Sequence, residues 1–162
     1  MTEFADELDV RARLDIADVL VRYASGIDRR DWALFRSCFT DDCLADYGDI
    51  GVWRGADEIT TWMDRAHQGA GHTMHRITNH DIRAEHDGAS ARSYVDAIVM
   101  GADNATGIRA VGDYDDELVR TEHGWQIRRR RFTPVLLQAV GSGIVTPEPE
   151  TSRFITIESE ER

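Results

Sequence analysis

The sequence predicts an α+β domain: a cone-shaped, strongly curved antiparallel sheet with three helices packed on its concave side. Before residue 70, apolar residues recur at the spacing of amphipathic helices. After residue 70, four long stretches are rich in β-branched and aromatic residues, and turn signals such as His86-Asp87-Gly88 separate them. Strands that follow one another as hairpins form one sheet, which must bury one face under the helices.

Three helices are expected, over 9–25, 29–39 and 57–67. Gly26 is expected to end the first helix, because glycine tolerates the left-handed conformation found at helix ends. Asp57 is a candidate cap for the third helix, because an aspartate side chain accepts hydrogen bonds from the first free amides.

The strands are expected in two groups. The long ones are predicted over 72–85, 89–101, 107–121 and 125–138, and two short ones over 43–47 and 51–54. Residues 1–145 form a single domain in this interpretation, and 146–162 form a C-terminal tail. Within the tail, the weak alternation of Phe154, Ile155 and Ile157 is compatible with an added strand or with a segment that docks on a neighbouring subunit.

Charge and composition exclude several classes of partner. The 162 residues include no lysine, and 19 arginines face 30 acids, for a net charge of −11. Such a surface repels nucleic-acid backbones and anionic membranes. No apolar run approaches the ~20 residues needed to span a bilayer. The acidic N-terminus differs from a signal peptide, and Cys38 and Cys43 are expected to be reduced thiols of a cytoplasmic protein.

The densest basic run is Arg128 to Arg131. On a strand, this run is expected to split into two pairs on opposite faces and to form ion pairs with the many acids. Phosphate-loop, dinucleotide-binding and nucleophile-elbow motifs are absent from the sequence. We therefore expect neither nucleic acid nor a nucleotide cofactor.

Two candidate site residues come from the first helix and the turn after it. Tyr23 lies on the apolar stripe, so its hydroxyl points inward and needs a partner. Asp28 has two interpretations: it caps the second helix, or it belongs to a site. If Gly26 ends the first helix, the turn brings the Asp28 carboxylate back beside Tyr23.

His75 is the third candidate. Strand alternation places His75, Ile77 and Asn79 on one face, and His72 and His80 on the other. His72 and His80 would lie ~26 Å apart at ~3.3 Å per residue, so no single metal ion binds both. An inward histidine is usually a packing residue unless a carboxylate orients it, in which case it is a general acid/base.

Acids at the ends of the strands supply a further possibility. Asp46 and Tyr47 end a short strand, while alternation sends Tyr114 and Asp116 one way and Asp115 the other. A carboxylic acid held neutral in an apolar site donates a hydrogen bond to a developing oxyanion, as in ketosteroid isomerase.

Several segments resemble the SnoaL-like group of the nuclear-transport-factor-2-like superfamily. They are 23–32, which reads YASGIDRRDW, and 39–42, 53–55, 73–75, 79–80, 114–118 and 124–125. The resemblance extends over about residues 10–137. It implies a nuclear-transport-factor-2-like, or cystatin-like, fold, and a reaction drawn from dehydration, isomerisation, cyclisation, epoxide hydrolysis or none.

Within that superfamily the chain is most similar to scytalone dehydratase and the bile-acid 7α-dehydratases. This implies a catalytic group of Tyr23, Asp28 and His75, with Asp28 orienting the imidazole. It also implies a substrate contact from Tyr47. Further candidates for contact with the substrate are Asp46, Trp53, Asn79 and Tyr114.

The sequence departs from those enzymes at three places. Ile27 stands where scytalone dehydratase has a water-positioning tyrosine, and Gly101 stands near the place of that enzyme's second histidine. Pro134 stands where the bile-acid enzymes have an arginine. The acid/base group is retained, whereas the groups specific to those substrates are not.

We therefore expect a cofactor-free and metal-free lyase or isomerase that acts on a hydrophobic cyclic ketone or enone such as a steroid or polyketide. One alternative is a non-catalytic ligand-binding module or a scaffolding subunit of a larger oxygenase. Another is a ketosteroid isomerase-like enzyme that uses Tyr23, Asp46 and either Asp115 or Asp116. A homo-oligomer is expected, a trimer rather than a dimer.

Overall fold

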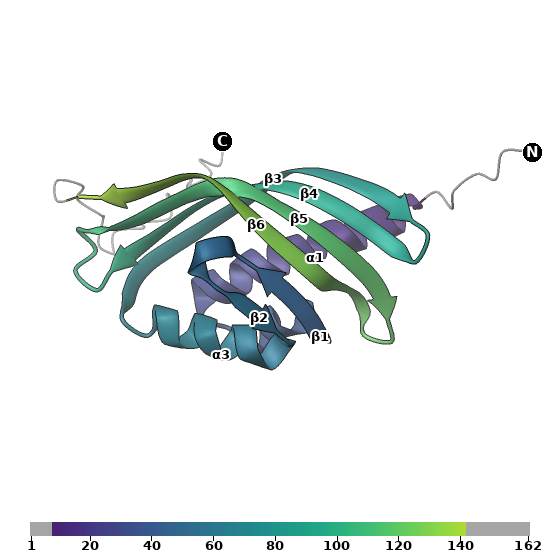
Figure 1. Cartoon of the computed structure of the whole chain (residues 1–162), viewed down its shortest axis with the longest axis horizontal. Coiled ribbons are helices and arrows are strands. Elements are labelled where there is room, and N and C mark those ends of the chain that lie inside the picture. Colours follow the sequence, from purple (N-terminus) through teal and green to yellow (C-terminus); the bar gives the residue numbers. More distant parts are fainter. Residues whose placement is uncertain (1–7, 142–162) are drawn as a thin grey trace, which may run out of the picture.

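The computed structural model describes residues 8–141 and consists of one six-stranded, curved open sheet with three helices on its concave side (Figure 1). The elements are α1 (Val10–Arg29), α2 (Trp32–Ser37), β1 (Phe39–Asp46), the 3-10 turn η1 (Gly48–Ile50), β2 (Val52–Arg54), α3 (Ala56–His67), β3 (Ala70–Glu85), β4 (Gly88–Gly101), β5 (Gly107–Thr121) and β6 (Gly124–Val140). The α+β class and all four long strands are confirmed, while the predicted tail, 146–162, lies outside the described residues.

The order of the strands is β2-β1-β6-β5-β4-β3. The four long strands form an antiparallel meander, in which each pairs with the next in sequence. The sheet continues beyond β6 with the two short strands. Here β1 pairs with β6 in parallel and forms a short antiparallel hairpin with β2. On the concave side, α1 packs against β3, which is the edge strand at the far end of this order (Figure 1).

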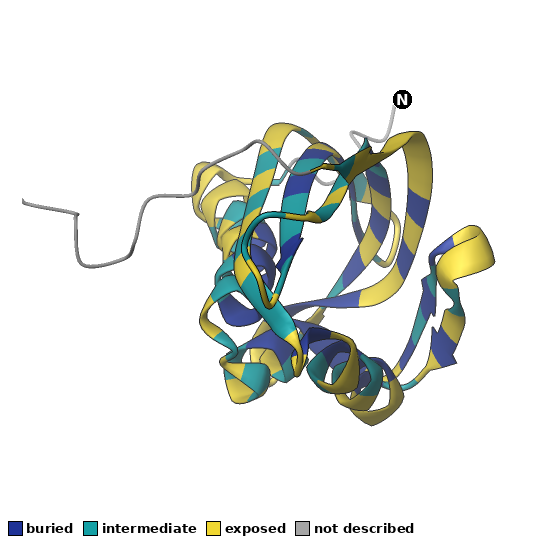
Figure 2. Cartoon of the chain, turned by 90° about the vertical axis from the view of Figure 1, so that its left-hand side faces the viewer, coloured by how far each residue is buried: buried dark blue, intermediate teal, exposed yellow. Residues whose placement is uncertain are grey.

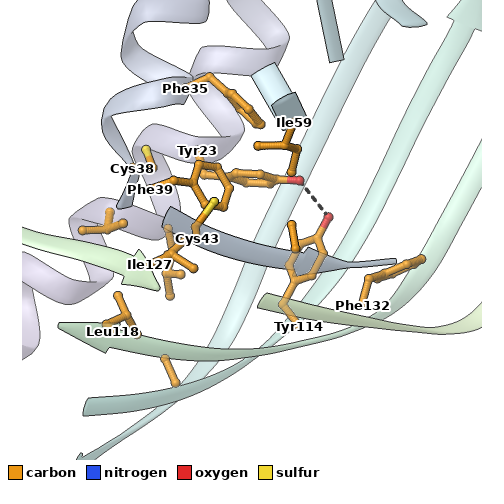
Figure 3. Packing of buried hydrophobic residues seen from close by; sticks show 14 of the residues in the cluster. Tyr23, Phe35, Cys38, Phe39, Cys43, Ile59, Tyr114, Leu118, Ile127 and Phe132 are labelled. Carbon is orange, nitrogen blue, oxygen red and sulfur yellow. Dashed lines mark hydrogen bonds between the residues drawn. The ribbon is translucent and has the colours of Figure 1, made fainter. Parts of the chain in front are cut away.

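The core lies between the helices and the concave face of the sheet (Figure 2). Along β4 and β5, buried and more exposed residues alternate, as expected for strands with one face covered. Tyr23 and Phe35 from the helices meet Leu118 and Ile127 from the sheet in this layer (Figure 3).

The first helix does not end at Gly26, so that prediction is wrong. The helix continues to Arg29, and Arg30 ends it in the left-handed conformation with φ of 58°. Gly26 is instead a packing position, because a Cβ there would lie 2.8 Å from the backbone nitrogen of Phe35. The glycine thus allows α2 to approach α1 closely, and Asp28 lies within the last turn of α1.

The cap of the second helix is Asp31, whose side chain accepts a hydrogen bond from the amide of Leu34 at 2.9 Å. The helix begins at Trp32 rather than at residue 29. Asp28 therefore has no capping role, which leaves its carboxylate for other partners. The expected cap of α3 is wrong as well, because Gly55 occupies the N-cap position and Asp57 forms an ion pair with Arg36.

A β-bulge interrupts β3 and changes the predicted faces. The register against β4 shifts between Thr78 and Asp81, and Asn79 adopts a positive φ of 55°. Asn79 is exposed as a result, and His80 takes the inward position, where it contacts the buried Ser93. The strict alternation that assigned Asn79 to the face of His75 fails because the bulge inserts one residue.

A second bulge divides the arginine run unequally. Glu117 pairs with Arg129 and Leu118 pairs with Ile127, so Arg128 is the extra residue. Arg130 alone of the four is buried, and the predicted two-and-two division is wrong. The predicted ion pairs do form: Arg128 contacts Glu117, and Arg130 contacts an acid of the core.

Cys38 and Cys43 are buried free thiols. Burial raises the pKa of each to about 11, so both remain protonated at neutral pH. Among residues 8–141, no helix is both long enough and apolar enough to cross a membrane.

Candidate active site

Asp28 and His75 form a two-point contact between the end of α1 and the first half of β3. One carboxylate oxygen of Asp28 lies 2.7 Å from Nδ1 of His75, and the other accepts the backbone N–H of His75 at 2.8 Å. The His75 side chain is 8% exposed and that of Asp28 is 23% exposed. The single carboxylate therefore positions both the backbone and the ring of the histidine.

The same contact determines the chemistry of the ring. Burial raises the pKa of Asp28, but the hydrogen bonds and charge of His75 outweigh it, and the pKa lies below its ordinary value. The ionised carboxylate can only accept, so Nδ1 of His75 carries the proton and Nε2 of the neutral ring has a free lone pair. This is the arrangement of a general base whose orientation a carboxylate holds.

Arg30 ties together the two segments that carry the dyad. Its guanidinium donates to the carbonyl of Ile27 at 2.7 Å, to the hydroxyl of Thr73 at 2.7 Å and to the carbonyl of Gly71 at 3.1 Å. The left-handed backbone of Arg30 turns the side chain back toward these groups. The start of β3 is thereby held against the end of α1 two residues before His75.

His67, the last residue of α3, lies beside the same group of residues. It is buried, contacts the Trp32 ring at a centroid distance of 5.9 Å, and interacts electrostatically with Arg30, Asp28 and His75. Burial lowers the pKa of His67. No pattern in the sequence indicated a role for this residue.

Three tyrosine hydroxyls form a second polar group in the core (Figure 3 shows the bond between Tyr23 and Tyr114). The hydroxyl of Tyr23 lies 2.8 Å from that of Tyr47 and 3.2 Å from that of Tyr114. Burial raises the pKa of both Tyr47 and Tyr114 well above its ordinary value, so both keep their protons. Two hydrogen bonds among three hydroxyls use two protons, which leaves one O–H to donate elsewhere.

Behind the tyrosines lies a fully buried ion pair. Nε and Nη2 of Arg130 each donate to an oxygen of Asp116 at 2.7 Å, and the guanidinium lies 4.1 Å from the ring centroids of both Tyr23 and Tyr114. Although burial lowers the pKa of Arg130, the charge of Asp116 outweighs it and the pKa is raised. Sequence reasoning missed this arginine because only the bulge at Arg128 reveals which of the four turns inward.

The predicted acids do not supply a free hydrogen-bond donor beside the tyrosine hydroxyls. Both oxygens of Asp116 accept from Arg130, while Asp115 pairs with Arg92 and is exposed. Asp46 accepts the backbone N–H of Gly48 at 3.0 Å. The geometry thus gives no support to the ketosteroid isomerase-like alternative.

The remaining predicted contacts are divided between the core and the surface. Trp53 is buried, packs edge-on against Tyr47 at a centroid distance of 5.3 Å, and lies 4.5 Å from the Trp62 ring. Asn79 is exposed at the bulge of β3, so its predicted substrate contact has no structural support. His80, which sequence reasoning assigned to the opposite face, lies with its Nδ1 2.9 Å from the Ser93 hydroxyl.

Tyr23 and Asp28 belong to the same helix and link the two polar groups. Five residues correspond to ~7.5 Å of rise along α1. The tyrosine cluster and the dyad are therefore both anchored by one helix, through Tyr23 and Asp28. Among residues 8–141, no group of three or more His, Cys, Asp or Glu side chains is arranged to hold a metal ion.

A hollow of about 690 Å³ is lined by residues of the sheet, among them the buried Arg130 and Asp116 that lie behind the tyrosines. Its walls include outward-facing charged side chains of the sheet, such as Asp46, Arg92 and Glu117, and neither residue of the dyad lines it. We therefore do not assign it to this site.

Residues 9–131 match the SnoaL-like domain family, and the chain belongs to that family. Uncharacterised proteins of Mycobacterium tuberculosis and Mycobacterium bovis are 32% identical to it over 124 residues, which is 75% of this chain and 84% of theirs.

Solved structures agree with this fold. A proposed aromatic ring hydroxylase of Novosphingobium aromaticivorans is 28% identical, with a TM-score of 0.75 over 82% of this chain and 95% of that one. A proposed scytalone dehydratase of the same organism is 20% identical, with a TM-score of 0.71 over 86% and 100%. A hexachlorocyclohexane dehydrochlorinase of Novosphingobium barchaimii is 18% identical, with a TM-score of 0.74 over 85% and 97%. The fold is the nuclear-transport-factor-2-like, or cystatin-like, fold that the sequence predicts.

Proposed function

We propose that the protein is a cofactor-independent lyase or isomerase that acts on a hydrophobic cyclic ketone or enone, such as a steroid or polyketide, with His75 as general acid/base. The observation that carries this proposal is the two-point contact of Asp28 with His75, at 2.7 and 2.8 Å. It leaves Nε2 of His75 as a base and places an ionised carboxylate where the protonated ring needs a counter-charge.

In the first step, Nε2 of His75 removes a proton from the carbon next to the substrate carbonyl. The C–H electron pair becomes the enolate double bond, and the carbonyl oxygen takes the negative charge. The spare O–H of the Tyr23, Tyr47 and Tyr114 cluster donates a hydrogen bond to that oxygen. Asp28 stabilises the imidazolium that forms.

In the second step, the enolate collapses in one of two ways. In a dehydratase, its electrons form the new C=C bond and expel a β-hydroxyl, which takes the proton from His75 and leaves as water. In an isomerase, His75 returns the proton to a different carbon. Both routes restore the neutral ring of His75 with its Nδ1 proton toward Asp28.

Two of the structurally similar proteins, a dehydratase and a dehydrochlorinase, are named for an elimination. Their identities to this chain, 20% and 18%, carry the fold alone. The proposal therefore depends mainly on the dyad and on the tyrosine cluster.

The test is turnover of a panel of cyclic β-hydroxy ketones and enones, from one to four rings, by the wild type, His75→Ala and His72→Ala. Loss of a general base typically costs about 10²–10⁴-fold in rate, so His75→Ala should fall by that factor while still binding the ketones. His72→Ala is the matched control, because His72 is exposed on the same strand. Full activity of His75→Ala would rule out the proposed role.

A second candidate function is a scaffolding or ligand-binding subunit of a larger oxygenase. One observation favours it: the structural neighbour at 28% identity is a proposed aromatic ring hydroxylase. Turnover by the isolated chain without any cofactor would exclude this candidate, whereas activity only in the presence of a partner oxygenase would favour it.

Two further proposals concern the state of the protein in solution and its location. We propose a homo-oligomer, a trimer or a dimer, because Tyr94, Ile108 and Leu137 of the sheet are 53%, 57% and 54% exposed. Light scattering after size-exclusion chromatography measures this directly, and a monomer would contradict it.

The cytoplasmic location stays a prediction that cell fractionation tests.

A further inference from the structure

His67 lies at the C-terminal end of α3 with one ring nitrogen in a defined bond. Its Nδ1 lies 2.8 Å from the backbone carbonyl of Met63. A carbonyl oxygen can only accept a hydrogen bond, so Nδ1 carries the proton and donates. In the neutral ring, Nε2 is therefore an acceptor with a free lone pair.

That acceptor is buried and has no partner in the described part of the chain. The residue is 9% exposed, and its ring packs against Trp32 at a centroid distance of 5.9 Å. Buried polar atoms in folded proteins nearly always have a hydrogen-bond partner, so an unpaired one needs an explanation. Here the missing partner must be a donor.

The neighbours of His67 connect it to the candidate active site. It interacts electrostatically with Arg30, Asp28 and His75. Arg30 is also the side chain that holds β3 against α1, through Thr73 and Gly71. The orphaned acceptor thus belongs to the group of residues that surrounds the dyad.

The environment keeps His67 neutral. Burial is the largest effect and lowers its pKa, and the electrostatic interactions with Arg30 and His75 lower it further. The hydrogen bond to the Met63 carbonyl and the charge of Asp28 act in the opposite direction, and the net shift is downward. A ring that stays neutral and has its proton committed to Met63 cannot donate to a carbonyl oxygen through Nε2. It recognises a hydrogen-bond donor, and on a cyclic ketone that donor is a hydroxyl.

We propose that His67 is a specificity-determining residue of this site, whose Nε2 accepts a hydrogen bond from a hydroxyl group of the substrate. This inference rests on the proposed function and deepens it, since the substrate is then a cyclic ketone with a hydroxyl in addition to any that leaves. The leaving hydroxyl needs a proton donor and is served by His75, whereas the hydroxyl at His67 donates its own proton and stays on the ring.

The test compares ketones with and without a stable hydroxyl. The probes are 1-tetralone against 5-, 6- and 7-hydroxy-1-tetralone, and, at four rings, estrone against its 3-deoxy analogue. Affinities are measured by calorimetry for the wild type, His67→Phe and His67→Gln. His67→Phe keeps a ring against Trp32 but removes the acceptor, while His67→Gln retains an acceptor oxygen near Nε2. Circular dichroism verifies that each variant is folded.

We expect the wild type to bind at least one hydroxyketone about tenfold more tightly than its deoxy partner. His67→Phe should abolish that preference, and His67→Gln should restore part of it. The ¹⁵N resonance of Nε2 should shift toward that of a hydrogen-bonded acceptor when the preferred hydroxyketone binds, and not with the deoxy ketone.

The outcomes separate this inference from the proposed function. Ketone binding with no hydroxyl preference, or a preference that survives in His67→Phe, overturns the role of His67 alone. An Nε2 resonance that already shows a hydrogen bond in the free protein and does not change on binding means that only water occupies the position, which also overturns it. A wild type that binds none of the ketones contradicts both proposals.

Discussion

Asp28 accepts two hydrogen bonds from a single residue, one from the imidazole Nδ1 of His75 at 2.7 Å and one from its backbone N–H at 2.8 Å. The backbone bond fixes where β3 passes the end of α1, and the ring bond fixes the orientation and tautomer of the base. Positioning and chemical tuning of His75 therefore depend on the same carboxylate.

Replacing Asp28 with asparagine should lower kcat far more than it changes KM. The amide is nearly isosteric and can still accept one bond, but it no longer supplies a negative charge opposite the imidazolium. We expect a loss of about 10²–10⁴-fold in kcat, measured on any ketone that the wild type turns over. Asp31→Asn is the matched control, because Asp31 caps α2 and an asparagine caps equally well.

The same substitution should change how stability depends on pH. The pKa of Asp28 lies below its ordinary value in the folded protein, so its contribution to stability is present above the ordinary pKa and is lost as the pH falls through the folded pKa. The wild type should therefore lose more stability than Asp28→Asn between pH 7 and pH 3, as measured by urea unfolding at both values. Equal losses would mean that the carboxylate is not stabilised by His75.

Tyr23 and Tyr114 should respond differently to replacement by phenylalanine. Tyr114→Phe leaves two hydroxyls joined by one bond, and one proton still remains to donate, so the rate should change little. Tyr23→Phe removes the central hydroxyl and both bonds, and leaves two buried hydroxyls unpaired at about 1–3 kcal/mol each in stability. Both remaining hydroxyls keep their protons but lose the bond that orients them, so kcat should fall by about 10²–10³-fold if the cluster stabilises an oxyanion through positioned donors. Equal rates for the two variants would argue against that role.

Breaking the buried Arg130–Asp116 ion pair should destabilise the protein far more than breaking an ion pair on the surface. Asp116→Asn leaves a buried guanidinium charge without its counter-charge, at a cost of about 3–5 kcal/mol. Glu117→Gln removes an exposed partner of Arg128 and should cost less than about 1 kcal/mol. The double replacement Asp116→Leu with Arg130→Met should recover most of the loss, since it removes both charges. Chemical denaturation curves of the four proteins test this order.

Sequence periodicity predicts the helices and the four long strands because those elements obey one repeat over many residues. It fails where a single residue breaks the repeat. The bulge at Asn79 moves His80 inward, and the bulge at Arg128 leaves Arg130 as the buried member of its run. Periodicity also fails to predict the role of Gly26. That role depends on the backbone of Phe35, which comes near only in the packed structure.

The candidate dyad was found in the sequence through resemblance, since nothing in the spacing alone relates Asp28 to His75 across 47 residues. The sequence left two interpretations of Asp28 open, a helix cap and a site residue. The structure excludes the cap, because Asp31 caps α2 instead. His67 and Arg30 had no sequence signal, because their importance comes from contacts between α3, the end of α1 and the start of β3.

The central claim is that His75 removes a proton next to a carbonyl, and deuterium exchange measures that step directly. 1-Tetralone is incubated in D₂O buffer with the wild type, His75→Ala or no protein, and deuterium at the carbon next to the carbonyl is followed by NMR. The account predicts exchange well above the buffer rate with the wild type and at the buffer rate with His75→Ala. Exchange by His75→Ala as fast as by the wild type, or a wild type no faster than buffer, would contradict it.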